Sequence, residues 1–220
     1  NRMRCRSDLK IGISGKMASG KSTVAKYLIE HHGFTLVSFA QPIKELEDIQ
    51  ANTANNRLAE IKLEPLINEL IAGENTPGST EAKRTQMKEW LLKLFNKYPR
   101  MPGQKNRELL QNLGHQAREH FGDGIWVNYA LRRAQKHNNV VIDDMRYENE
   151  ALLLKDAGFN LWRIEIDPQE QKRRLLEIYG EKALESIGHS SEVGLDNKSH
   201  LFDQIIYNNE DLHELYRKVD

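Results

Sequence analysis

A glycine-bounded segment near the start of the chain has the residue types that hold phosphate. Residues 15–22, Gly-Lys-Met-Ala-Ser-Gly-Lys-Ser, fit the pattern G-x-x-x-x-G-K-[ST]. The glycines allow backbone N–H groups to turn toward phosphate oxygens, where a Cβ would clash. The segment predicts a nucleoside-triphosphate site that uses Gly15, Met17, Ala18, Ser19, Gly20, Lys21, Ser22 and Thr23.

Two side chains of this segment have distinct chemical uses. Lys21 has the reach to bridge the β- and γ-phosphates of a bound triphosphate, and the Ser22 hydroxyl suits Mg²⁺. The alternative is a glycine-rich turn between a strand and a helix whose lysine is only solvated. The context favours the phosphate site, because a β-prone run precedes the segment and a helical pattern follows it.

The surrounding pattern predicts an open α/β sheet. A strand at 9–14, a helix at 21–32 ended by Gly33, a strand at 35–39 and a helix opened by Pro42 alternate along the chain. Further strands are expected at 139–143, 161–166 and 204–207, with helices at 147–157, after Pro168 and at 212–219. We expect a P-loop NTPase fold, a five-stranded, mostly parallel sheet sandwiched by helices.

The stretch from Asn52 to Arg107 interrupts this alternation. Apolar residues recur there at helical spacing, and the aromatic stripe from Met87 to Tyr98 is typical of core packing. We expect a helical acceptor-binding insertion at 51–125, a core at 1–50 and 126–220, and a small lid at about 168–198. Residues 180–198 have few apolar anchors and resemble a mobile loop.

The composition of the chain argues against several classes of binding partner. The chain has 220 residues with 32 basic and 32 acidic side chains, a balance that argues against nucleic-acid polymers and anionic membranes as main partners. No stretch approaches the roughly 20 apolar residues of a membrane span. Cys5 stands alone and the first ten residues lack the apolar core of a secretion signal. We expect a cytoplasmic protein.

Several classes that bind phosphate fit poorly. The chain contains no Asn-Lys-x-Asp segment to read guanine and no G-x-G-x-x-G fingerprint for a dinucleotide, and it is short for a mechanical ATPase. A small-molecule kinase must offset the repulsion between two phosphate groups, which favours several nearby arginines. If the chain is such a kinase, arginines beyond the phosphate segment are expected to take part in the site.

Arginines occur at the places such a kinase requires. Asp143-Asp144-Met145-Arg146 follows a central strand, at the edge where ligands of open α/β sheets bind. Spacings of four and seven place Arg107, Gln111 and Arg118 on one helix face. Arg173 and Arg174 lie beside the expected mobile loop, where a lid would bring them over the phosphates. For each arginine the alternative is a surface ion pair.

The chain resembles the phage-type deoxynucleoside monophosphate kinases, a branch of the P-loop nucleoside monophosphate kinases. The resemblance rests on segments that occur in order and span most of the chain outside the helical insertion. They are Gly15 to Ser22, Ser38 to Glu45, Arg107 to Gly114 with Arg118, Trp126-Val127, Val141 to Ala151, His189 to Glu192 and Asp203 to Asn209.

The resemblance implies ATP as donor, Mg²⁺ as cofactor and a deoxynucleoside monophosphate as acceptor. It implies an acceptor pocket lined by Lys44, Arg107, Gln111, Arg118, Trp126, Asp144 and Arg146. It places Asn208 near the donor adenine and Arg173 and Arg174 in or near the lid. The expected catalytic residues are Lys21, Arg146, Arg173 and Arg174.

Some alternatives stay open at this point. Asp143 stands where the family commonly has a small residue, so it either contacts Mg²⁺ beside Ser22, through water, or has no role. A dephospho-coenzyme A kinase, a phosphomevalonate kinase or a non-catalytic ATP-binding module would share the phosphate segment. The accepted bases, the choice between deoxyribose and ribose, a homodimeric state and a phage-infected host cell as location also stay open.

Overall fold

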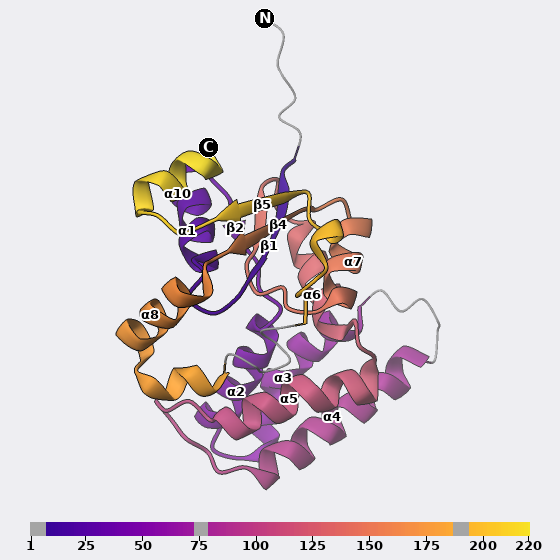
Figure 1. Ribbon diagram of the computed structural model, residues 1–220. Coiled ribbons are helices and arrows are strands. Elements are labelled where there is room, and N and C mark those ends of the chain that lie inside the picture. The colour runs from indigo at the N-terminus through magenta and orange to yellow at the C-terminus, as the bar shows by residue number, and fades with distance from the viewer. Residues whose placement is uncertain (1–7, 73–78, 187–193) are drawn as a thin grey trace, which may run out of the picture. The chain divides into compact units, whose positions relative to one another are not determined.

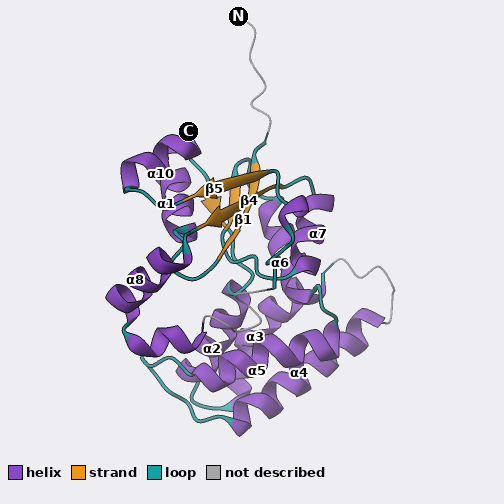
Figure 2. Cartoon of the chain, viewed as in Figure 1, coloured by secondary structure: helices purple, strands orange, loops and turns teal. Residues whose placement is uncertain are grey.

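The computed structural model describes residues 8–72, 79–186 and 194–220. The chain divides into two compact units, which we call the sheet unit (residues 1–38 and 130–220) and the helical unit (residues 39–129). All strands of the described residues belong to the sheet unit (Figure 2).

A five-stranded parallel sheet forms the centre of the sheet unit. Its order is β2-β3-β1-β4-β5, and every neighbouring pair runs parallel. The strand bounds are β1 (Lys10–Gly15), β2 (Thr35–Leu36), β3 (Val140–Ile142), β4 (Asn160–Glu165) and β5 (Gln204–Tyr207). The central position of β1 places the loop that follows it at the middle of the carboxyl edge, and the α/β expectation is confirmed.

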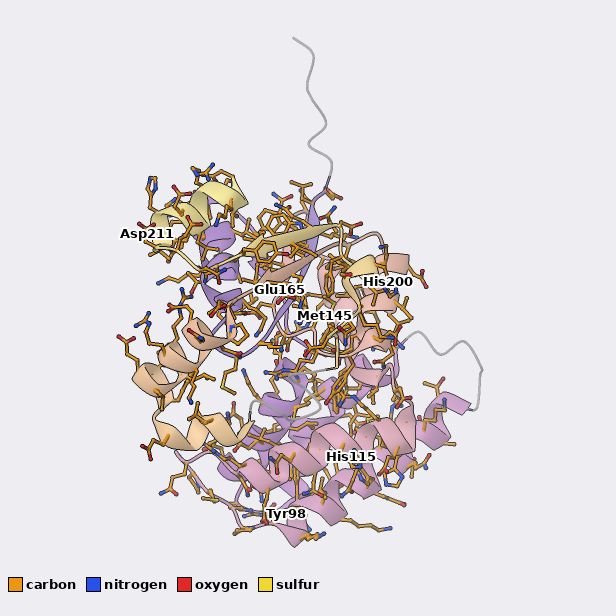
Figure 3. The ribbon with its side chains drawn as sticks, in the orientation of Figure 1. Tyr98, His115, Met145, Glu165, His200 and Asp211 are labelled. Carbon is orange, nitrogen blue, oxygen red and sulfur yellow. The ribbon has the colours of Figure 1, made fainter. Side chains whose placement is uncertain are left out.

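Helices cover both faces of this sheet (Figure 1). On one face, α1 (Lys21–His32) and α10 (Leu212–Val219) contribute Leu28 and Leu215 to a buried cluster that includes Ile13 of β1. On the other face lies α7 (Glu148–Asp156), and a Cβ at Gly12 of β1 would meet its Leu154 side chain at 2.9 Å. The fully buried Met145, labelled in Figure 3, belongs to this second face.

Helix ends in the sheet unit follow the signals in the sequence. Gly33 ends α1 in the left-handed conformation, with a φ of 69°. Asp167 caps α8 (Pro168–Tyr179), because its side chain accepts hydrogen bonds from the N–H groups of Gln169 and Glu170. The short helices η1 (Glu181–Ser186) and η2 (Ser199–Leu201) complete this unit.

Two expectations about local structure are wrong. The strand expected at 35–39 covers only Thr35–Leu36 in the structure, because after one more bond at Val37 the chain turns toward Asp144, to which Ser38 donates. The loop expected from Gly180 to Lys198 begins with the helix η1, and Leu195 near its end is buried. Residues 187–193 of that loop lie outside the described residues.

The helical unit packs its own core. Met87, Leu91, Leu94 and Phe95 of the expected stripe are buried, which confirms its packing role. The helices are α2 (Gln41–Asn52), α3 (Asn56–Ile71), α4 (Ser79–Lys97), α5 (Arg107–Phe121) and α6 (Ile125–Ala134), whose last residues belong to the sheet unit.

Among the described residues, no helix combines the length and apolar character needed to cross a bilayer.

Candidate functional site

The segment between β1 and α1 adopts a tightly turned conformation. We call Gly15–Ser22 the phosphate loop. A Cβ at Gly15 would lie 2.5 Å from the backbone oxygen of Ile164 and 2.6 Å from Ser19 Oγ, so only glycine fits there. Ala18 has a φ of 61°, a left-handed conformation that costs a residue with a Cβ about 1 kcal/mol or more. Such strain at a loop is typical of a functional site.

The phosphate loop leads into a helix end that suits an anion. Gly20 precedes α1 with a φ of 100°, no side chain caps the helix, and the first turn has no acidic residue. The N-terminus of a 12-residue helix offers N–H groups and the positive end of its dipole to a phosphate. Ser19 Oγ is buried without a hydrogen-bond partner among the described residues, a polar group that the protein alone does not satisfy.

Lys21 lies across the phosphate loop. Its ammonium group donates to the backbone oxygen of Gly15 at 2.5 Å and to that of Lys16 at 2.9 Å. The side chain thus follows the loop that the sequence assigned to phosphate. A lysine in this position holds the loop and carries its charge to the place where phosphate oxygens would be cradled.

A buried arginine links the sheet to the phosphate loop. Arg163 of β4 is 4% exposed, and its guanidinium donates to Glu165 (labelled in Figure 3) and to Asp196, each at 2.8 Å. The second carboxylate oxygen of Asp196 pairs with Lys16 of the phosphate loop at 3.0 Å. A buried charge needs such partners to offset its desolvation. Asp196 therefore joins the phosphate loop to the segment that precedes η2.

The carboxyl end of β3 positions the expected acidic and basic residues. Ser38 Oγ donates to Asp144 at 2.7 Å, which fixes that carboxylate. The buried Glu150 accepts from the backbone N–H of Arg146 at 2.7 Å, so the first turn of α7 orients the arginine's backbone. Asp143 and Arg146 are both half-buried, and β3 pairs directly with β1.

Two side-chain oxygens are candidate ligands for Mg²⁺, one in the first turn of α1 and one directly after β3. Ser22 is exposed at the first turn of α1, and Asp143 follows β3. No group of three or more His, Cys, Asp or Glu side chains in the described ranges could hold a metal. Mg²⁺ usually keeps several waters and takes one or two protein oxygens besides substrate phosphates, so Ser22 and Asp143 fit this ion without such a cluster.

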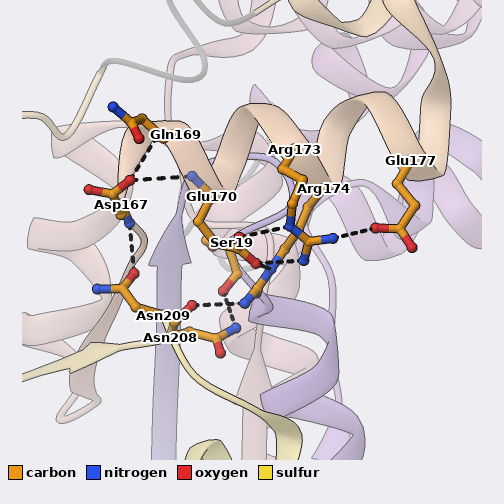
Figure 4. Close-up of polar contacts among 9 residues, drawn as sticks. All are labelled: Ser19, Asp167, Gln169, Glu170, Arg173, Arg174, Glu177, Asn208 and Asn209. Carbon is orange, nitrogen blue, oxygen red and sulfur yellow. Dashed lines mark hydrogen bonds and ion pairs between the residues drawn. The ribbon is translucent and has the colours of Figure 1, made fainter.

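The two arginines expected in the lid lie on α8 and share one carboxylate. Glu170 accepts from Arg173 and from Arg174, and Arg173 also pairs with Glu177 at 2.8 Å (Figure 4). Hydrogen bonds from Arg173 first, and from Arg174, lower the pKa of Glu170 from 4.5 to about 2. The Arg173 side chain is 62% exposed, whereas that of Arg174 is 18% exposed.

Asn208 lies beneath the phosphate loop. It is 5% exposed, and its amide nitrogen donates to the backbone oxygen of Ser19 at 2.8 Å. Its backbone oxygen accepts from Arg174 at 3.1 Å, so α8, Asn208 and the loop form one chain of contacts (Figure 4). The expected place of Asn208 near the donor adenine stays a prediction.

In the helical unit, α5 presents the expected acceptor residues on its polar face. Leu109, Leu113 and Ala117 are buried on the opposite face, so Arg107 and Gln111 lie exposed and Arg118 half-buried. Asn106 caps α5 by accepting from the N–H of Leu109 at 3.0 Å. The backbone N–H of Asn106 donates to the buried Glu47 of α2, which fixes where the helix begins.

The remaining acceptor candidates of the helical unit differ in exposure. Lys44 is exposed on α2. Trp126 is 1% exposed, and its indole N–H donates to the backbone oxygen of Gly114 at 3.1 Å. In this structure Trp126 braces α5, and its contact with an acceptor stays a prediction.

Other expected or functional residues stand apart from these groups. His189 to Glu192, part of the family resemblance, lie outside the described residues. Sequence reasoning missed Arg163, although a charge within an otherwise apolar strand was a usable signal. It also missed Asp196 and Gln171, which no local pattern distinguishes.

A phosphate loop between β1 and α1 of a parallel α/β sheet defines the P-loop NTPase fold. A family model described as an AAA domain matches residues 11–192. The chain therefore belongs to this family of AAA domains.

Two individual proteins are similar over nearly the whole chain. An Acanthamoeba polyphaga mimivirus protein named "Putative deoxynucleotide monophosphate kinase" is 27% identical, over 95% of this chain and 93% of that protein. The crystal structure of TT1252 from Thermus thermophilus covers 96% of this chain and 94% of its own, with 18% identity and a TM-score of 0.46.

The shared carboxylate on α8 leads to a testable prediction. Because its pKa is lowered to about 2, Glu170 stays ionised at pH 3.5, where an ordinary glutamate is mostly protonated. The stabilisation it gives is complete above about pH 4.5 and is lost as the pH falls toward 2. The carboxyl ¹³C shift of Glu170 measures this ionisation.

Substitution of the arginines supplies the control. Arg173→Gln should raise the pKa of Glu170 toward 4.5, whereas Arg217→Gln, on the exposed surface of α10, should leave it unchanged. A Glu170 carboxyl that is already protonated at pH 3.5 in the unaltered protein would show that the arginine pair does not form in solution.

Proposed function

We propose that this protein transfers the terminal phosphoryl group of ATP to deoxynucleoside 5′-monophosphates, in a direct in-line reaction with Mg²⁺. The observation that carries the proposal is the phosphate loop, whose strained turn ends at an uncapped helix N-terminus with Lys21 lying across it. This arrangement is better explained by a site for the triphosphate tail of a nucleotide than by a turn that is only solvated.

The acceptor half of the proposal rests on the polar face of α5. Arg107, Gln111 and Arg118 share this face, and Asn106 fixes its start. Guanidinium groups bind a phosphate with paired hydrogen bonds, so a helix face with two of them suits a monophosphate. The mimivirus relative, similar over 95% of this chain, bears a name that matches this acceptor class.

The chemistry requires charge neutralisation and positioning more than covalent help. Two phosphate groups that approach within a few ångströms repel each other by several kcal/mol at an effective dielectric constant of about 20. Lys21 and the amides of the phosphate loop hold the donor, and Arg107, Arg118 and Arg146 hold the acceptor phosphate in line. When bound, Mg²⁺ neutralises the β- and γ-oxygens of the donor.

Other side chains of the proposed site orient or enclose it. Ser22 and Asp143 are the oxygens that would hold the metal, Asp143 through water, and Asp144 is fixed for acceptor contact by Ser38. Lys44 and Trp126 complete the proposed acceptor set, and Asn208 that of the donor. Arg173 and Arg174 belong to the proposed lid, which excludes water and so limits wasteful ATP hydrolysis.

An acceptor panel tests the reaction itself. Coupled ADP release should depend on dAMP, dGMP, dCMP, dTMP or 5-hydroxymethyl-dCMP, with their ribonucleotide counterparts and dephospho-coenzyme A as comparisons. We expect release with at least one deoxynucleoside monophosphate and none with dephospho-coenzyme A. Release with dephospho-coenzyme A alone, or ATP binding without release for any acceptor, would assign the chain to a different function.

Removal of the loop lysine tests the donor site. Lys21→Ala should lower kcat by about 100-fold or more, since a charged group that stabilises the transition state is lost. Lys26→Ala is the matched control, because Lys26 lies exposed on the same helix in a loose pair with Glu30 at 3.7 Å. Near-normal turnover of Lys21→Ala would contradict the assigned role of the phosphate loop.

A further inference from the structure

The backbone oxygens of the phosphate loop are held by side chains of the protein. A trans peptide is planar, so the N–H of one residue points opposite to the oxygen of the residue before it. Whatever fixes a loop oxygen therefore also fixes the direction of the next N–H. Lys21 does this for Gly15 and Lys16 from within the loop.

Gln171 of α8 holds a third loop oxygen from outside the loop. Its amide nitrogen donates to the backbone oxygen of Met17 at 3.0 Å, and the residue is 5% exposed. Burying an amide is costly unless its polar atoms find partners. The bond directs the N–H of Ala18 away from α8, and it acts at the most strained residue of the loop, since Ala18 is left-handed.

Asn208 holds a fourth loop oxygen. Its amide nitrogen donates to the backbone oxygen of Ser19 at 2.8 Å, which directs the N–H of Gly20 to the other side of the loop (Figure 4). A Cβ at Gly20 would lie 2.5 Å from this amide nitrogen, so the glycine makes room for the brace. Arg174 and the carbonyl of Asn208 tie the same brace to α8.

We propose that Gln171 and Asn208 are positioning residues for the donor, which hold the N–H groups of Ala18 and Gly20 toward the phosphate tail of a nucleoside triphosphate. This inference rests on the proposed function, which supplies the triphosphate. It adds how the N–H groups of the phosphate loop are oriented before the nucleotide binds. Two buried amides from separate parts of the chain, one on α8 and one directly after β5, both bind loop oxygens. A role confined to packing would place apolar side chains there.

The test compares shape-conserving variants that lack the donor group. Gln171→Met and Asn208→Leu each leave one loop oxygen unheld, so each should weaken ATP binding by about tenfold, in line with the loss of a buried hydrogen bond. Titration calorimetry with ATP and Mg²⁺, without acceptor, measures the binding. Gln169→Met is the matched control, because Gln169 is exposed on the same helix.

Steady-state kinetics separate positioning from folding. In the panel assay, both variants should raise KM for ATP by about tenfold and leave KM for the acceptor within twofold. Variants that bind ATP as tightly as the unaltered protein would overturn the inference, and so would a fall in thermal stability with equal changes in both KM values. If one variant does not fold, the other decides the outcome by the same criteria.

The proposed function fails in a distinguishable way. Unaltered protein that does not bind ATP in calorimetry would overturn the donor site and this inference together. Unaltered protein that binds ATP, beside variants that bind it equally well, overturns the positioning role alone.

Discussion

The proposed donor site depends on one constraint, the orientation of successive peptide planes in the phosphate loop. Residues 16–20 must turn within the span that joins β1 to α1. Side-chain bonds to the backbone oxygens of Gly15, Lys16, Met17 and Ser19 maintain this turn. Lys21 of α1, Gln171 of α8 and Asn208, which directly follows β5, supply these bonds. The conformation of the phosphate loop thus depends on side chains from several parts of the sheet unit, although the sequence pattern of the loop covers only eight residues.

Charged side chains around the phosphate loop share their partners. The charge of Lys16 is engaged by Asp196, which also stabilises the buried Arg163, while Lys21 donates to neutral loop oxygens. On α8, Glu170 neutralises Arg173 and Arg174 in the same manner. In each case a shared carboxylate offsets the repulsion between two neighbouring cations. In the proposed reaction, an incoming phosphate would compete with these carboxylates for the cations.

The sequence predicted the sheet well because its signals are local. Apolar runs, the glycine that ends α1 and the proline that begins α8 act within a few residues, and the structure has these elements close to the expected bounds. The strand expected at 35–39 is shorter in the structure because it ends where Ser38 bonds to Asp144. These two residues are 106 positions apart in the sequence. Local patterns contain no information about such a partner.

Residues of the candidate site also differ in whether a local sequence pattern reveals them. The phosphate loop was evident from eight consecutive residues, but Gln171, Asp196 and Arg163 act across separations of 33 to 154 residues. Asn208 was expected near the adenine from resemblance, which stays a prediction, and the bond of its amide to the loop was not expected. Site residues that act through backbone orientation leave no spacing pattern, so they emerge only from the fold.

The most direct measurement of the central claim is an amide ¹H–¹⁵N NMR titration with ATP and Mg²⁺. The account predicts that the largest shifts occur at the amides of residues 16–22, with Ala18 and Gly20 among them, because these groups would contact the phosphates. The donor site would be contradicted if ATP binds and the resonances of these amides do not shift. It would also be contradicted if the largest shifts occur at amides elsewhere in the chain.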